Sequence, residues 1–89
     1  MDTERKPNYH RLMKISGKQI RAARALTGLT QRQLATAAGL SLATVNNFER
    51  QELDLRMSSA ARMQSALESV GVEFLADDGV RLRQPPSGA

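Results

Sequence analysis

The chain has no cysteine and no tryptophan, and its single histidine, His10, has no cysteine near it. Without cysteine there are no disulfides and no thiolate metal sites. One isolated histidine does not anchor a Ser-His-Asp set, and neither a Gly-rich phosphate loop nor a metal-ligand spacing is present. We therefore expect no enzyme activity, no catalytic residues, no bound metal and no cofactor.

Long apolar runs are also missing, since the longest is only a few residues. This predicts no membrane span, and no secretory segment follows Met1. A cytoplasmic location is the expectation. A chain of 89 residues allows one small domain, which is marginally stable alone. Good helix packing or a partner subunit is therefore needed.

Positive charge is in excess, with a net charge of +4, and it is unevenly placed. Residues 1–30 contain seven Lys or Arg against two acidic residues, whereas residues 31–60 are balanced and residues 61–89 are slightly acidic. An uneven basic charge suits a polyanion such as nucleic acid. Solubility alone is the other interpretation.

The segment Gln31–Arg50 has the most informative pattern. Its apolar residues recur three or four apart in two runs, which predicts short helices over 31–38 and 42–50, each with one buried face. Gly39 suits the left-handed residue that ends the first helix, and Ser41 suits the cap of the second. Together with the small Ala35, this predicts a helix-turn-helix.

Further helices are expected on both sides. Ser16 and Gln19 form a capping box before a helix that ends near Thr27 and Gly28, and Thr30 with Gln33 forms another before the helix over 31–38. After a polar loop over 51–56, a helix is expected from Ser58 or Ser59 to Val70. Its predicted inner face is Met57, Ala60, Met63, Leu67 and Val70.

Residues 72–83 predict a β-hairpin, with strands Val72–Ala76 and Val80–Arg83 on either side of Asp77-Asp78-Gly79, where Asp-Gly is a strong turn signal. Its exposed edge is a possible template for a dimer. The expected domain spans 15–83. Residues 1–14 are read as a flexible basic arm, which either reaches DNA or only aids solubility, and residues 84–89 as a disordered tail.

The helix-turn-helix residues resemble the Cro/CI (XRE) family of phage repressors and bacterial regulators, over roughly 17–72. The matching residues are Gln31, Leu34, Ala35, Ala38, Gly39, Leu40, Ser41, Thr44, Val45, Phe48 and Glu49, with Arg24 in the preceding helix. The resemblance implies a mostly α, lambda-repressor-like four-helix domain, here followed by the hairpin. It also implies a regulator of transcription, most often a repressor, that binds double-stranded DNA. The small size of the chain and the hairpin favour a homodimer, which would bind an inverted-repeat operator.

In this family the second helix of the motif lies in the major groove. The outward residues expected to read bases are Leu42, Ala43, Thr44, Asn46 and Asn47. Asn can pair with adenine and Ala can pack on a thymine methyl group. Leu42, where the family often has a polar residue, indicates either an apolar methyl contact or weaker hydrogen-bonded readout. The residues expected near phosphates are Gln31, Lys18, Arg32 and Arg50.

Arg24 and Glu49 both lie near apolar faces, where an unpaired charge is costly. The resemblance implies an ion pair between them that joins the first helix to the end of the recognition helix. The alternative is two exposed charges that contribute little.

Two other functions remain open from the sequence. One is an antitoxin that binds a partner protein and its own promoter, because several Cro/CI-type proteins do so. The other is RNA binding, which is weaker because two Phe and one Tyr offer few stacking surfaces.

Overall fold

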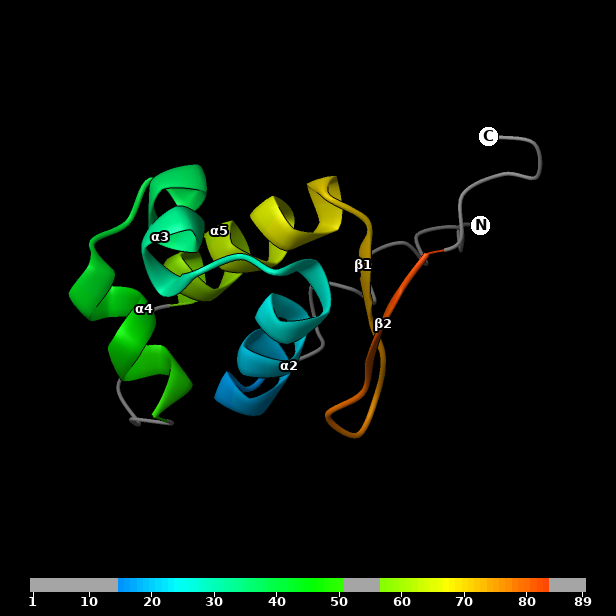
Figure 1. Cartoon of the computed structure of the whole chain (residues 1–89). Coiled ribbons are helices and arrows are strands. Elements are labelled where there is room, and N and C mark those ends of the chain that lie inside the picture. Colours follow the sequence, from blue (N-terminus) through cyan, green and yellow to red (C-terminus); the bar gives the residue numbers. More distant parts are fainter. Residues whose placement is uncertain (1–14, 51–56, 84–89) are drawn as a thin grey trace, which may run out of the picture.

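The computed structural model describes residues 15–50 and 57–83, and for Met57 the backbone only. Within these residues four helices precede a two-stranded antiparallel hairpin, so the predicted fold class is confirmed (Figure 1). The predicted arm over 1–14, the loop over 51–56 and the tail over 84–89 lie outside the described residues. The elements are α2 (Gly17–Thr27), α3 (Gln31–Ala38), α4 (Leu42–Glu49), α5 (Met57–Ser69), β1 (Val72–Phe74) and β2 (Val80–Leu82).

The helix ends follow the predicted caps. Ser16 caps α2 and Thr30 caps α3, each in a complete capping box, and the hydroxyl of Ser41 accepts the N–H of Thr44 at 3.0 Å at the start of α4. Gly39 has a φ of +71° after α3, a left-handed conformation that costs glycine little. The turn between α3 and α4 is therefore tight, as the motif requires.

The core lies where α2, α3, α4 and α5 meet the inner face of the hairpin (Figure 1). α3 packs on both α4 and α5, while the hairpin covers α2 and α5 on the side away from α4. The largest fully buried side chains are Ile20, Leu34, Val45, Met63, Leu67 and Val72. Helix α4 therefore forms part of one side of the domain, and the hairpin forms part of another.

The prediction for α5 was wrong at its C-terminal end. Met63 and Leu67 are fully buried as expected, but Val70 is 52% exposed. The helix ends at Ser69, and Gly71 at φ +101° turns the chain into β1. Val70 therefore lies beyond the last helical turn and no longer follows the helical period.

The hairpin has shorter strands than predicted, and the centre of its turn lies within the predicted segment 77–79. The pairs are Val72 with Leu82, Glu73 with Arg81, and Phe74 with Val80. Asp77 and Asp78 both have positive φ, 58° and 64°, and the N–H of Gly79 donates to the carbonyl of Ala76 at 3.2 Å. The two positive φ angles are those of a type I′ turn centred on the two aspartates.

The hairpin turn is fastened to the start of α2. Gln19, only 2% exposed, donates its side-chain N–H groups to the carbonyls of Leu75 and Gly79, each at 2.9 Å. The hydroxyl of Ser16 donates to Asp78 at 2.7 Å. The hairpin is thereby held to the helical body by polar contacts as well as by its apolar face. None of the described helices is long and apolar enough to cross a membrane.

Candidate nucleic-acid interface

Helix α4 has one buried side and one exposed side. Val45 and Phe48 enter the core, while Ala43 and Asn47 are exposed. Residues four apart lie on the same helix face, so Ala43 and Asn47 form one outward stripe. Leu42 begins the helix and is 37% exposed, although it is a large apolar residue. Helix α4 therefore presents two apolar side chains to solvent in its first turn and one amide a turn later.

The other two predicted base readers, Thr44 and Asn46, are half-buried and are engaged within the protein. The hydroxyl of Thr44 lies 2.9 Å from that of Ser41, beside the cap of α4. The Nδ2 of Asn46 donates to Oε1 of Gln31 at 3.4 Å, a long contact. These two side chains lie at the edges of the exposed face of α4. Of the five predicted base readers, only Leu42, Ala43 and Asn47 make no such side-chain contact with another described residue.

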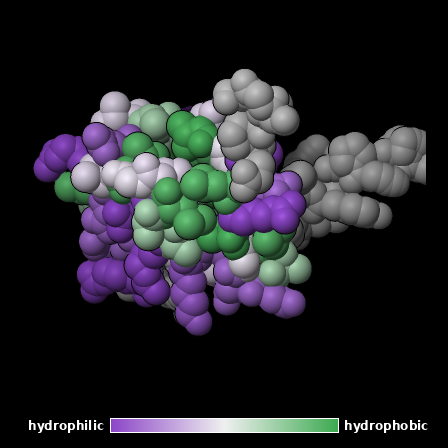
Figure 2. Space-filling model, turned by 45° about the vertical axis from the view of Figure 1, so that its right-hand side comes forward, coloured by the Kyte–Doolittle hydropathy of each residue, from purple (hydrophilic) through white to green (hydrophobic). Residues whose placement is uncertain are grey.

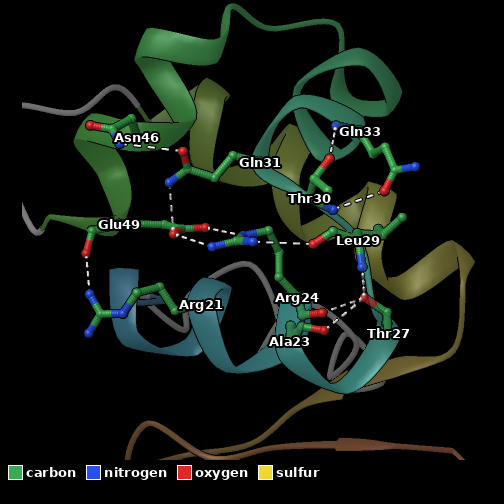
Figure 3. Close-up of polar contacts among 10 residues, drawn as sticks. All are labelled: Arg21, Ala23, Arg24, Thr27, Leu29, Thr30, Gln31, Gln33, Asn46 and Glu49. Atoms are coloured by element: carbon green, nitrogen blue, oxygen red, sulfur yellow. Dashed lines mark hydrogen bonds and ion pairs between the residues drawn. The ribbon is translucent and has the colours of Figure 1, made fainter.

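Arg24 and Glu49 form a bidentate ion pair between α2 and the end of α4 (Figure 3). Nε of Arg24 lies 2.6 Å from Oε2 of Glu49, and Nη2 lies 2.8 Å from Oε1. The Glu49 side chain is 3% exposed and that of Arg24 is 23% exposed. The hydrogen bond to Glu49 raises the pKa of Arg24, outweighing the opposite effect of burial, and so favours its charged form. The pair fixes α4 against α2.

Two further polar side chains hold the same end of α4 (Figure 3). Nη1 of Arg21 donates to the backbone carbonyl of Glu49 at 2.7 Å, and Nε2 of Gln31 donates to its carboxylate at 3.0 Å. Sequence reasoning did not assign Arg21 a role. The available signal was its spacing, since Arg21 and Arg24 are three apart on one helix and so reach the same neighbour.

The predicted phosphate neighbours Lys18, Arg32 and Arg50 are all exposed, while Gln31 is half-buried. Arg32 lies in the first turn of α3, Arg50 follows the last residue of α4, and Lys18 follows Gly17, which is packed against the end of α4. The exposed cations therefore lie around the motif. The amide of Gln31 already bonds Glu49 and Asn46, so its contact with a phosphate stays a prediction, as do the others.

No group of three metal-ligating side chains occurs among the described residues. The structure has a short helix, α4, with an exposed N-terminal face, packed across α3, and exposed cations occur in α2, in α3 and directly after α4. This arrangement defines a helix-turn-helix domain of the DNA-binding type.

The comparison with known families agrees with this geometry. A family model described as "Helix-turn-helix" matches residues 20–75, more than half of the chain. The chain belongs to this family, the Cro/CI-type helix-turn-helix or XRE family, and is a DNA-binding regulator of transcription of that type. No curated protein matches the chain.

Proposed function

We propose that the chain is a sequence-specific repressor that binds double-stranded DNA as a homodimer on an inverted-repeat operator. The observation that carries the proposal is the exposed stripe of Ala43 and Asn47 on a helix whose other end is fastened by Arg24, Arg21 and Gln31. A base-reading helix must be held rigidly if its side chains are to distinguish base edges.

The mechanism is occupancy of the operator. The cations Lys18, Arg32 and Arg50 contact phosphates and set affinity and register, while α4 enters the major groove and selects sequence. Asn47 pairs with an adenine through its amide in this proposal. A repressor bound in this way excludes polymerase from an overlapping promoter.

The second copy of the chain is proposed to pair along β2. The N–H of Leu75 donates to Gly79 and that of Arg83 donates to Gly71, so hydrogen-bonded and non-hydrogen-bonded pairs alternate between these ends. The backbone groups of Val80 and Leu82 then point away from β1. They form a free strand edge, and among the described residues nothing pairs with it. Antiparallel pairing of two β2 strands would complete it around a two-fold axis.

Exposed apolar side chains also occur on the hairpin and at the ends of the helices that contact it. Of the large apolar residues that are exposed in the described part of the chain, Leu82 is on β2 itself, and three more lie elsewhere in the hairpin or at the ends of α2 and α5: Leu26, Val70 and Leu75. Figure 2, which turns the hairpin side forward, shows hydrophobic residues gathered in the middle of that face. Apolar surface of this kind marks a protein contact when it is contiguous. A second copy is the partner that supplies both a matching strand and a second recognition helix.

Selection of binding sites from a random duplex pool tests the proposal. The expected result is an inverted repeat with half-site centres about one helical turn apart, ~34 Å. Asn47→Ala and Ala43→Gln should change or abolish the consensus, whereas Arg32→Gln should weaken binding to all sequences about equally and reduce its salt dependence. The exposed Thr36→Ser on the same helix as Arg32 serves as the matched control and should leave the consensus unchanged.

Absence of any enriched sequence, with only weak and steeply salt-dependent binding, would contradict specific readout by this chain. Enrichment of a single half-site without a repeat would contradict the homodimer but not the sequence-specific binding. Co-purification with a second protein, together with binding to its own promoter, would favour the antitoxin function that the sequence leaves open.

A further inference from the structure

We infer that Leu42 and Ala43 form an apolar reading surface for the 5-methyl groups of thymine, so that the operator half-site is read at T·A pairs under the start of α4. The inference rests on the proposed function, since it names the chemical group that α4 recognises. The observation that carries it is that the first two residues of the recognition helix, a leucine and an alanine, are both exposed.

The polar side chains of α4 leave little else to read bases near its N-terminus. The hydroxyl of Thr44 lies within hydrogen-bonding distance of Ser41, and the amide of Asn46 contacts Gln31. Glu49 is 2% exposed and is bound by Arg24. Between Leu42 and Asn46 no outward side chain is therefore both polar and free of an internal contact within the described residues.

The exposure of Leu42 has no explanation within the described fold. At 37% exposure it is not among the core residues or among the partly buried residues packed on them, whereas Leu40, two positions earlier, is packed on the core. Leu42 is the first residue of α4, the end of a recognition helix that meets base edges. Ala43, the next residue, heads the outward stripe that Asn47 continues.

The major groove offers one apolar group, the C5-methyl of thymine. Guanine is most often read by Arg or Lys, and α4 contains neither between Leu42 and Glu49. A surface of leucine and alanine gains most by covering methyl groups and excluding water from them. The chemistry of α4 thus favours thymines under Leu42 and Ala43 and an adenine under Asn47.

Substitution of deoxyuridine for thymine tests the inference, because it removes the methyl group and leaves the Watson–Crick edge unchanged. Each thymine of the selected operator is replaced in turn, and the affinity of the full chain is measured at fixed salt. At one or two positions per half-site the affinity should fall about threefold to fivefold, the value expected for one buried methyl group.

The Leu42→Ala variant assigns the contact to its side chain. It should bind the thymine operator more weakly than the unmodified chain, and should no longer distinguish thymine from deoxyuridine at the position under Leu42. Asn47→Ala is the matched control, since it should lower affinity but retain the deoxyuridine effect. Because Leu42 is exposed, Leu42→Ala should unfold at the same temperature as the unmodified chain.

A consensus whose affinity is unaffected by every deoxyuridine would overturn the inference and leave the proposed function intact. An effect that persists unchanged in Leu42→Ala and in Ala43→Ser would also overturn it, because the methyl groups would then be read by other side chains. If the pool yields no enriched sequence at all, the proposed function fails first and the inference with it.

Discussion

The backbone of α2 meets the backbone of α4 at Gly17 and Phe48. A Cβ atom built on Gly17 would lie 2.3 Å from the carbonyl oxygen of Phe48 and 2.9 Å from that of Glu49. A Cβ atom and a carbonyl oxygen that are not bonded to each other do not approach so closely. Backbone atoms also cannot move aside as the end of a flexible side chain can. The absence of a side chain at Gly17 therefore sets how near the recognition helix lies to α2.

Gly17→Ala should therefore destabilise the domain by about 1–3 kcal/mol, the usual effect of forcing an extra group into a packed site. Since α4 must shift to make room, affinity for the operator should fall by more than the unfolded fraction explains. Thermal unfolding and operator binding below the transition measure the two effects. Ala25→Ser, a small addition at an exposed position of the same helix, is the control. Unchanged stability and unchanged binding would contradict the close approach.

Removing one member of the Arg24–Glu49 pair should be more harmful than removing both. Glu49→Ala leaves Arg24 without its partner and should cost about 3 kcal/mol in the free energy of unfolding. Arg24→Leu combined with Glu49→Leu should recover part of this loss, because no unpaired charge remains near the core. Binding by the double variant should stay impaired, since Gln31 loses its carboxylate partner and α4 loses its fastening.

Urea denaturation of Arg24→Leu, of Glu49→Leu and of the double variant measures this coupling, with Glu49→Ala measured beside them. The Glu73–Arg81 pair on the hairpin, with side chains 38% and 65% exposed, is the internal comparison, and Glu73→Ala should cost less than 1 kcal/mol. As the hydrogen bond raises the pKa of Arg24, its stabilising charge is present at neutral pH and is lost only in strongly alkaline solution. If Glu49→Ala and Glu73→Ala lowered the free energy of unfolding equally, the buried pair would contribute no more to stability than the exposed one.

The local rules of the sequence were sufficient for the helices and for their ends. Ser16, Thr30 and Ser41 carry cap signals that act within three residues, and Gly39 carries the left-handed turn, so neighbours in sequence decide these features. The family resemblance supplied the Arg24–Glu49 pair, which joins residues 25 positions apart.

What the sequence did not predict depends on contacts between distant segments. The bond from Arg21 to the end of α4 and the bonds from Gln19 to the hairpin turn join residues 28 to 60 positions apart. From the sequence, Gln19 has only the local role of a capping residue, in which its side-chain oxygen accepts the N–H of Ser16. Its side-chain N–H groups, however, donate to the distant carbonyls of Leu75 and Gly79. Within the predicted turn, Asp77 and Asp78 take the two positions of positive φ, because aspartate tolerates that conformation better than most residues.

Gln19 should be needed for the hairpin to stay on the helical body. Gln19→Leu leaves the carbonyl of Leu75 without its donor at a site with little solvent, and should cost about 1–3 kcal/mol. Gln19→Glu should cost more at neutral pH, since a carboxylate would face two carbonyl oxygens. Hydrogen exchange of the Leu75 amide, which donates to Gly79, reports the hairpin directly and should speed up in both variants. Exchange that is unchanged there, with only the N-terminus of α2 affected, would limit Gln19 to capping.

The free edge of β2 should be needed for the dimer but not for folding of the subunit. Leu82 is 41% exposed, so Leu82→Lys should leave the unfolding transition of the monomer in place while halving the molar mass in sedimentation equilibrium. Leu82→Pro tests the backbone, because the N–H that proline removes points away from β1 and is not needed within the hairpin. Ser65→Lys adds the same charge at an exposed position of α5 and should leave the mass unchanged. A dimer that survives both changes at Leu82 would exclude β2 as the interface, whereas a monomeric Leu82→Lys that still binds a single half-site would separate assembly from base reading.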